Sequence, residues 1–519
     1  MSQLLLYYQR PEPATWVFLS SFLLLSLYFV FHRFFSVRNL DIILLLLLAP
    51  GLMMVYEGRR QRIEETTIVA TTGELVNASR NSSRTGSTGE KRQSNFWDDS
   101  LPKNILFPKA NLSFVASAGN SGGPLQTADL VQTADETGGK TRASGLGDDG
   151  SNQQDAYPRE PVPQFNPSWK PRAIEFYGFV VLLVACAFLM IRMLVDPALV
   201  RRPLLLPNLS IGGLSFIGIS LFLFLMANVA TSTPREQAER GPSLGPGYVL
   251  LNMLPSLPTT PEGSSVGNED GVAGGPVSPW LPNVTRILSI LSNLAIVAGI
   301  IGIGYWHFGN INTGIGCAVL YLILPYTAQM TGNVEHTVPA AFLVAALLAY
   351  RQPVASGALL GTAAGLVYYP FFLLPLWISF YWHRGLAKFL TGIGIGVGVL
   401  IIMLFFSGSS FSDSFQTMFG LWSPRMKGLE GIWATDYGLA AEFRLPILVG
   451  CILLAGSFVF WPPRKTLATL LCGSAASMIA VQFWHGFGGG LYMAWFLPFT
   501  LLTMFRPNLD DRIAENVLR

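Results

Sequence analysis

The feature that most constrains this chain is a series of apolar segments, each close to twenty residues long. The longest are 14–31, 174–194, 209–228 and 389–406. An α-helix of about 20 apolar residues spans the hydrocarbon core of a bilayer. Only 13% of the 519 residues are charged and 50% are hydrophobic, whereas a soluble globular protein carries about 25% charged residues. The sequence therefore predicts an all-α, polytopic integral membrane protein.

Apolar segments and two polar insertions divide the chain. We predict spans at 14–31, 41–56, 174–194, 209–228, 286–305, 313–331, 337–350, 389–406, 446–461, 466–482 and 489–505. The insertions, 57–173 and 229–285, have too few large apolar groups to offset the entropy cost of ordering, so we expect both to be largely disordered. The regions are N-terminal spans (1–56), a polar loop (57–173), two spans (174–228), a Pro/Gly-rich loop (229–285), a multi-span core (286–506) containing loop 407–445, and a tail (507–519).

Basic residues near the span ends predict the orientation, because Lys and Arg accumulate in short cytoplasmic loops. The positions are Arg33, Arg38, Arg201, Arg202, Arg351, Arg384, Lys388, Arg464, Lys465 and Arg506. They predict a multi-pass cell-membrane protein with its N-terminus outside, its C-terminus and tail in the cytoplasm, and the long loops on the outer face. On the cytoplasmic side, Asp41 and Asp196 are interpreted as solvated charges at span ends. The four cysteines lie inside apolar runs, which predicts that they are buried.

Residues 354–382 need a different interpretation, because Arg351 and Arg384 flank them and both favour the cytoplasm. About 30 residues are too few for two full crossings. Pro370 lies near the middle of the stretch and cannot continue a helical hydrogen-bond ladder. We therefore predict a hairpin of two short half-helices that meet within the membrane. One tilted helix is the alternative, but it would place one of the basic groups on the wrong side.

The core contains a pattern found in a known family. Gly332-Asn333 opens an apolar run, Arg351 follows in a basic turn, and "SGALLGTAAGLVYY", Pro370 and "FFLLPLWISF" come next. Near the end, "QFWHGFGGGLYMAWFLPFTLL" places an aromatic–His stretch before the last apolar segment. Over roughly 286–506 the chain resembles polyprenol-phosphate-sugar-dependent glycosyltransferases of the GT-C fold, and it is most similar to glycosyltransferase family 87, which is mannosyltransferase-like.

This resemblance implies inverting transfer of a sugar from a polyprenyl-phosphate carrier to an acceptor at the outer membrane face. An outer-face carboxylate would deprotonate the acceptor hydroxyl, and cationic or hydrogen-bonding groups would hold the leaving phosphate. The chain departs from the family in two places. Tyr369 stands before the proline where the family has Lys, and the acidic motif of the first outer loop is missing, which leaves Glu57 as its nearest positional counterpart.

Glu335 and His336 are candidate catalytic residues, because ionisable groups near membrane depth usually face the bundle interior or water. Asn333 is the neighbouring candidate for binding substrate. The structural alternative is a short outer turn bracketed by Gly332 and Pro339, since both residues punctuate turns.

Further candidates for binding substrate lie at the predicted hairpin tip and in outer loops. They are Tyr368, Tyr369, Arg425, Lys427, Arg444 and His485. The tyrosines could instead hydrogen-bond backbone groups freed by the helix break, and His485, before a flexible "GFGGG", could belong to an interfacial aromatic belt. The cationic loop could equally be a surface amphipathic segment. The "GIGIGVG" at 392–398 is interpreted as close helix packing by small residues.

Two other function classes remain open. A membrane transporter or flippase-like carrier would also use a broken hairpin, because discontinuous helices form midplane sites. A non-catalytic membrane scaffold would fit the missing acidic motif. The expected partners are the bilayer and a lipid-linked sugar. A net charge of +3 and the lack of a basic block point away from nucleic acid. We identify no metal ligands in the sequence, and the use of a divalent metal stays open.

Overall fold

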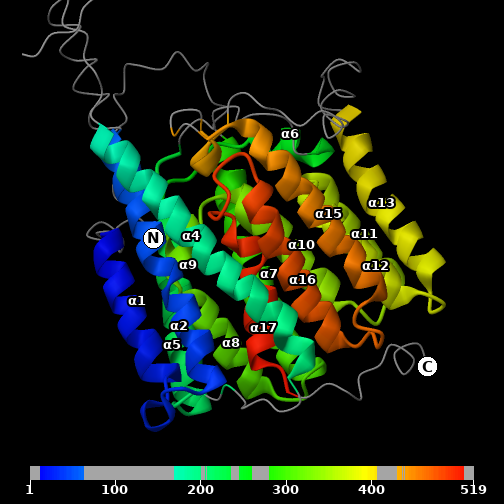
Figure 1. Ribbon diagram of the computed structural model, residues 1–519, viewed down its shortest axis with the longest axis horizontal. Helices are drawn as coiled ribbons and strands as arrows, with labels where there is room; N and C mark the ends of the chain where they lie inside the picture. Colours follow the sequence, from blue (N-terminus) through cyan, green and yellow to red (C-terminus); the bar gives the residue numbers. More distant parts are fainter. Residues whose placement is uncertain are drawn as a thin grey trace, which may run out of the picture. The chain divides into compact units, whose positions relative to one another are not determined.

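The computed structural model describes residues 12–62, 169–199, 205, 207–234, 245–259, 280–405, 429–434, 437 and 439–507. These residues belong to one compact unit in which helices pack side by side as a bundle (Figure 1). Seven of the described helices are long and apolar enough to cross a membrane. The prediction of an all-α membrane protein is confirmed at this level.

The helices follow the predicted spans closely over most of the chain. The bundle contains α1 (Pro13–Tyr28), α2 (Val37–Leu46), α4 (Trp169–Val195), α5 (Ile211–Ala230), α6 (Pro246–Asn252), α7 (Leu281–Trp306), α8 (Ile311–Ile323), α9 (Pro325–Met330), α10 (Val334–Leu348), α11 (Pro353–Leu366), α12 (Leu374–Tyr381), α13 (Leu386–Phe405), α15 (Arg444–Phe460), α16 (Leu467–Trp484) and α17 (Leu497–Phe505). Short 3-10 turns precede α12 and α17, namely η5 (Tyr369–Leu373) and η10 (Met493–Trp495). After α2 the helical path continues to Arg62.

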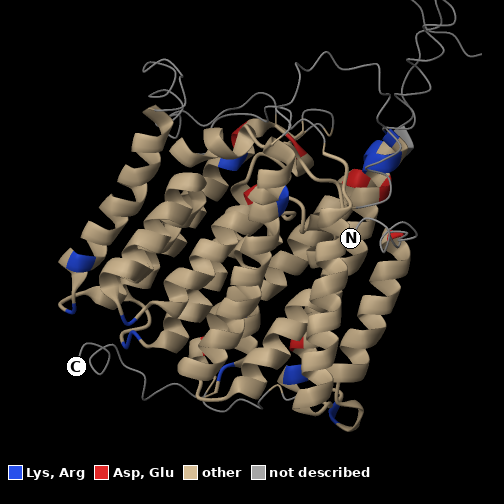
Figure 2. Ribbon diagram, turned by 180° about the vertical axis from the view of Figure 1, so that it is seen from behind, with Lys and Arg blue, Asp and Glu red and all other residues tan. Residues whose placement is uncertain are grey.

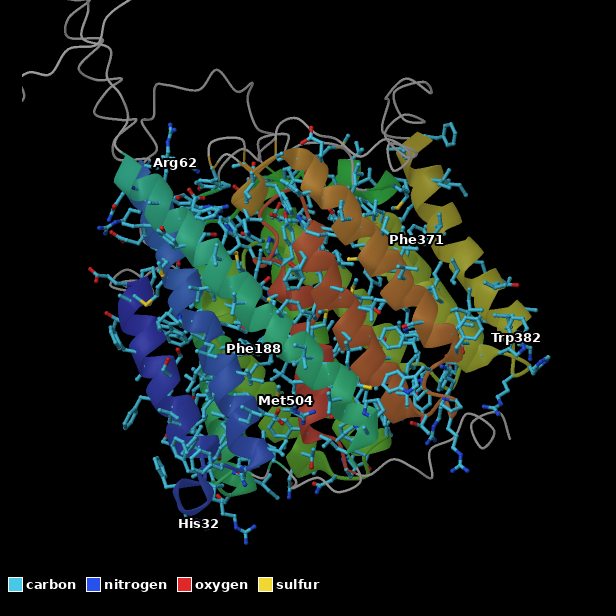
Figure 3. The ribbon with its side chains drawn as sticks, viewed as in Figure 1. His32, Arg62, Phe188, Phe371, Trp382 and Met504 are labelled. Atoms are coloured by element: carbon cyan, nitrogen blue, oxygen red, sulfur yellow. The ribbon has the colours of Figure 1, made fainter. Side chains whose placement is uncertain are left out.

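The exterior of the bundle is apolar, as expected of a surface that contacts lipid. Phe188 projects from α4 and is 53% exposed, whereas Met504 on α17 is buried (Figure 3). Lys, Arg, Asp and Glu gather toward the two ends of the bundle (Figure 2). The most enclosed of the membrane-length helices is α16, of which 94% is buried. The bundle is therefore organised around α16, with lipid-facing helices outside it.

The predicted break in 354–382 is confirmed. Helix α11 ends at Leu366, η5 carries Pro370, and α12 continues from Leu374. Helix α13 covers α11, and glycines let the two backbones touch. A Cβ added at Gly392 or Gly396 would collide with carbonyl oxygens of Val354 or Ala358 on α11. The interpretation of 392–398 as close helix packing by small residues is therefore confirmed at Gly392 and Gly396, whereas a Cβ at Gly394 or Gly398 would meet no atom within 4 Å.

Several predicted boundaries were wrong. The span 313–331 is two helices, because Pro325 begins α9 after an extended Leu324. The segment 489–505 contains only α17 as an α-helix, after a buried loop. Helix α10 begins at Val334, three residues before the predicted start. The insertion 229–285 contributes α6, which packs on α11 and α13. The ends of insertion 57–173 are helical, and residues 63–168 lie outside the described part of the chain.

Asp41 and Asp196 are buried, and the prediction that they are solvated was wrong. The Nε and Nη2 atoms of Arg192 donate to the two carboxylate oxygens of Asp41 at 2.7 and 3.1 Å. Its Nη1 donates to Asp196 at 2.8 Å, and Arg506 Nη2 donates to the other Asp196 oxygen at 2.6 Å. We call Asp41, Arg192, Asp196 and Arg506 the ion network. It joins the ends of α4 and α17 to the start of α2, and its two positive and two negative charges balance.

Candidate functional site

A column of five aromatic rings lies beside the hairpin break. In order, the rings are those of His336, Tyr492, His485, Tyr369 and Tyr368. Neighbouring centroids are 4.2, 4.3, 4.5 and 4.1 Å apart, and no adjacent pair of planes is tilted by more than 32°. All five residues are buried. We call these five residues the ring column. Four of its members were predicted from the sequence as site residues, namely His336, Tyr368, Tyr369 and His485. They are up to 149 residues apart in the sequence.

Three separate segments build the ring column. The first turn of α10 carries His336, and η5 with its preceding residue carries the tyrosine pair. The loop between α16 and η10 carries His485 and Tyr492. This loop is fully buried, so the prediction that "GFGGG" is flexible was wrong.

Glycine is required in the loop for steric reasons. Gly488 and Gly490 have φ angles of 79° and 96°, in the left-handed region that favours glycine. A Cβ at Gly489 would collide with the carbonyl oxygen of Gln482. The side-chain oxygen of Gln482 accepts a hydrogen bond of 3.1 Å from the Gly490 N–H. Close packing of the loop backbone against Gln482 of α16 therefore fixes the positions of His485 and Tyr492.

His485 has one ring nitrogen engaged and one without a partner. Its Nδ1 accepts a hydrogen bond of 3.1 Å from the Phe487 N–H. In a neutral ring the proton then lies on Nε2, which becomes a donor. Nε2 is buried and has no hydrogen-bond partner among the described residues, and the same holds for the adjacent indole Nε1 of Trp484. Buried polar atoms are nearly always paired, so each of these two donors could serve an acceptor oxygen of a bound ligand.

At the other end of the ring column, His336 is held by a tyrosine. The hydroxyl of Tyr326, on α9, lies 2.7 Å from His336 Nδ1. The helix break between α8 and α9 therefore places Tyr326 at the site. Glu335 is also buried, and its backbone carbonyl accepts a hydrogen bond of 3.3 Å from the indole N–H of Trp495. Both candidates belong to the first turn of α10, so the structural alternative of a short turn is not what the structure has at these positions.

Arg444 places a positive charge next to the ring column. Its Nε and Nη2 atoms donate to the Trp484 carbonyl oxygen at 3.3 and 3.1 Å, and its guanidinium lies 5.5 Å from the Trp484 ring centroid. It lies within electrostatic range of Tyr368 and Tyr369. The residue is 4% exposed. A buried guanidinium can hold a phosphate oxygen by charge-assisted hydrogen bonds.

A short segment covers this region. The Glu430 N–H donates to the Gly486 carbonyl oxygen at 2.8 Å, and the Trp433 indole N–H donates to the Phe483 carbonyl oxygen at 3.0 Å. Loop 407–445 therefore contacts the site through residues 429–434. Arg425 and Lys427, the other two cationic candidates in that loop, lie outside the described residues.

The remaining candidates occupy different surroundings. Asn333 caps α10, and its amide lies 3.5 Å from the Met330 sulfur. Glu57 accepts hydrogen bonds from Arg60 at 3.2 Å and Gln61 at 2.7 Å on its own helix, and its side chain is 39% exposed. Glu57 thus makes a surface ion pair, the kind of contact that contributes little. It is not among the residues that contact the ring column.

Sequence reasoning missed Tyr326, Tyr492 and Trp495. Each is an aromatic residue within an apolar run, where an aromatic residue most often packs in the core. The signal that could have found Tyr326 is its position after Pro325, which breaks the helix and exposes nearby backbone. Among the described residues, no group of three or more His, Cys, Asp and Glu is placed to hold a metal ion.

Comparisons with known proteins add no family. No family model matches the chain, and no curated protein or solved structure is significantly similar to it. The function therefore has to be argued from the ring column and its surroundings.

Proposed function

We propose that this chain is an integral membrane glycosyltransferase of GT-C type that transfers a sugar from a polyprenyl-phosphate carrier to an acceptor at the outer membrane face. The observation that carries the proposal is the ring column, flanked by buried Glu335 and Arg444, with a His485 Nε2 that has no hydrogen-bond partner within the described part of the chain. Such a transfer uses a carboxylate as general base and cationic or hydrogen-bonding groups that stabilise the leaving phosphate.

The reaction assigns a role to each group. The acceptor oxygen attacks the anomeric carbon of the donor sugar, and the bond from that carbon to the phosphate oxygen breaks. Glu335 takes the proton of the acceptor hydroxyl as general base. The polyprenyl phosphate leaves with the bonding electron pair, and Arg444 stabilises the negative charge that develops on it. His485 Nε2–H donates to an oxygen of the donor.

Burial makes these interactions stronger. Charges and dipoles in a water-excluded site interact more strongly than in bulk water, and the ring column is enclosed by α10, α16 and η5. The rings have a fixed spacing, so donors on the column keep their orientation during transfer. Preorganised donors of this kind need no reorganisation at the moment of reaction.

A membrane carrier is the second candidate, and a specific observation favours it. Two broken segments, α8–α9 and α11–η5–α12, both bring side chains to the ring column, as Tyr326, Tyr368 and Tyr369 show. Discontinuous helices that meet at a common site are typical of secondary transporters.

A single preparation can separate the two functions. The purified full-length chain is reconstituted in liposomes with radiolabelled polyprenyl-phosphate hexoses and a crude membrane-lipid acceptor. We expect labelled product from the unaltered chain and at least a hundredfold loss in Glu335→Gln, since general-base catalysis contributes about 10²–10⁴-fold. The matched control is Glu442→Gln, an exposed carboxylate two residues before Arg444, which should keep full turnover.

Two outcomes would contradict the proposal. Solute flux without labelled product would favour the carrier. Product formation that is unchanged in Glu335→Gln but abolished in Glu57→Gln would assign the general base to Glu57.

A further inference from the structure

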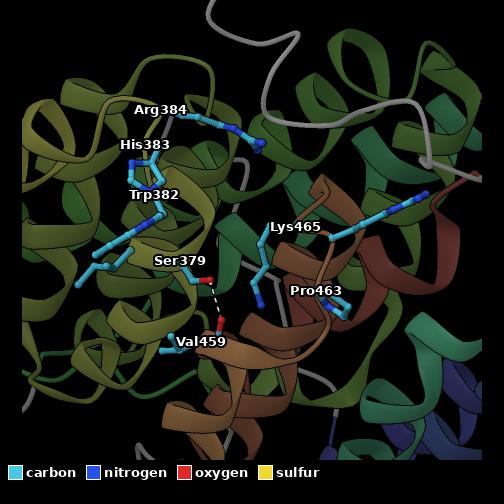
Figure 4. A pocket seen from close by; sticks show the side chains of 9 residues that line it. Ser379, Trp382, His383, Arg384, Val459, Pro463 and Lys465 are labelled. Atoms are coloured by element: carbon cyan, nitrogen blue, oxygen red, sulfur yellow. Dashed lines mark hydrogen bonds between the residues drawn. The ribbon is translucent and has the colours of Figure 1, made fainter.

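A second polar site lies at the opposite end of the bundle, where the predicted cytoplasmic turns meet. It is a cavity of about 820 Å³ between the C-terminal ends of α12 and α15 and the start of α16. We call it the turn pocket, and its nine lining residues are Ile378, Ser379, Trp382, His383, Arg384, Val459, Pro463, Arg464 and Lys465. In Figure 4, Trp382, His383 and Arg384 form one wall, and Pro463 and Lys465 lie across from them.

The chain geometry directs basic side chains toward this pocket. After α12 the backbone turns sharply through His383 and Gly385, whose φ angles of 60° and 109° are left-handed. That turn leaves Arg384 at the pocket wall. On the other side, Arg464 and Lys465 occupy the connection between α15 and α16. Two segments separated by about 80 residues in the sequence therefore bring their charges to one cavity.

The turn pocket is strongly positive. Two arginines and a lysine line it, with a histidine beside them, and none of its nine lining residues is acidic. Lys465 is buried, and its Nζ donates to the Phe458 carbonyl oxygen at 2.6 Å. An ammonium group carries two further N–H donors. Burial lowers the pKa of Lys465, so an anion beside it would stabilise its charged form.

The pocket also has an apolar rim. Trp382 lines the pocket and is exposed, and the exposed Phe460 and Trp461 lie in the sequence between its lining residues Val459 and Pro463. Phe460 is 83% exposed. Apolar surface of this kind at the end of a membrane helix contacts acyl chains, and aromatic side chains favour the headgroup level. A soluble phosphate would use the cations and gain nothing from this rim. A lipid headgroup would use both.

We propose that the turn pocket binds the phosphate headgroup of an anionic membrane lipid, whose acyl chains lie against Trp382, Phe460 and Trp461. Basic pockets between transmembrane helices on the cytoplasmic side are suited to anionic headgroups. This site is independent of the proposed sugar transfer, because it lies at the other end of the bundle and shares no residue with the ring column.

Native mass spectrometry of the purified full-length chain in a non-ionic detergent tests the proposal. Phosphatidylglycerol and phosphatidylcholine of identical acyl composition are titrated separately, and bound lipid is counted. We expect tighter binding of phosphatidylglycerol. The double variant Arg384→Gln/Arg464→Gln should weaken that binding about tenfold or more, because each basic residue near the membrane surface contributes about 1 kcal/mol.

Two further double variants serve as controls for the number of charges and for their position. Arg351→Gln/Lys388→Gln removes the same number of charges from exposed positions at the same end, outside the pocket lining, and should change binding less than about twofold. Arg384→Lys/Arg464→Lys keeps both charges and should retain most of the binding if the pocket acts electrostatically. Size-exclusion profiles confirm that each variant is folded.

Inorganic phosphate distinguishes the two sources of the anion. We expect that phosphate in large excess fails to displace phosphatidylglycerol. Displacement by phosphate at concentrations similar to that of the lipid would assign the pocket to a soluble anion and overturn the lipid proposal. Unchanged phosphatidylglycerol binding in Arg384→Gln/Arg464→Gln would overturn the site itself.

Discussion

The buried charges of the ion network are paired with one another, whereas the buried polar groups of the ring column are packed mainly against aromatic rings. In the ion network, Arg192 bridges Asp41 and Asp196 with hydrogen bonds of 2.7–3.1 Å. In the ring column, His485 keeps a buried Nε2 with no partner among the described residues. Charges that are fully paired with one another hold helices together. A buried donor without a protein partner, such as His485 Nε2 among the described residues, can instead bind a ligand. The following predictions test this difference.

The largest expected effect is on stability, at the ion network. Arg192→Met leaves Asp41 as a buried carboxylate without its bidentate partner, and breaking a buried ion pair costs about 3–5 kcal/mol. We expect a large drop in the midpoint of thermal unfolding in detergent, measured by loss of the monodisperse peak. Arg33→Met, at an exposed site, should stay within about 0.5 kcal/mol of the unaltered chain. Equal midpoints for the two variants would show that the network does not stabilise the bundle.

A smaller loss is expected from Arg444→Met beside the ring column. The Trp484 carbonyl loses its charged donor, and a lost hydrogen bond to a charged group costs about 1.5–3 kcal/mol. The same unfolding measurement applies. A loss of stability as large as that of Arg192→Met would show that Arg444 stabilises the bundle as much as the ion network does. That result would contradict the difference proposed between the ion network and the ring column.

The third prediction concerns Gly489, whose backbone packs closely against α16 beside the ring column. Gly489→Ala forces a Cβ against the Gln482 carbonyl oxygen, and overpacking of this kind costs about 1–3 kcal/mol. Gly394→Ala is the matched control, because a Cβ there meets no atom within 4 Å and alanine favours helix. We expect a lower unfolding midpoint for the first variant only. Similar midpoints would show that the loop adjusts easily.

The smallest effect on stability is expected at His485. His485→Asn keeps an acceptor for the Phe487 N–H and removes the Nε2 donor, so the main structural loss is ring stacking, worth about 1 kcal/mol. Turnover should nevertheless fall about a hundredfold, because removing one preorganised donor costs about 10²–10³ in rate. Unfolding midpoints and sugar-transfer assays on the same preparation check both parts.

The sequence predicted much of the bundle and only part of the site. Apolar length predicted the membrane class, and Pro370 predicted the hairpin break, because both depend on local chemistry. The loop around His485 could not be recognised from the sequence, since glycine-rich sequence is typical of flexible surface and of tightly packed backbone alike. Asp41 and Asp196 looked solvated because their partners, Arg192 and Arg506, come from other helices. The pairing of Tyr326 with His336 likewise depends on how α9 packs against α10, which no local pattern reveals.

One measurement compares the two clusters most directly. Transfer from labelled polyprenyl-phosphate sugar is assayed for Arg192→Met and His485→Asn, and each rate is divided by the amount of folded protein. We expect Arg192→Met, although less stable, to turn over per folded molecule like the unaltered chain, and His485→Asn, although nearly as stable, to lose about a hundredfold. Full turnover in His485→Asn, or an equal loss in both variants, would contradict the assignment of the ring column as the functional site.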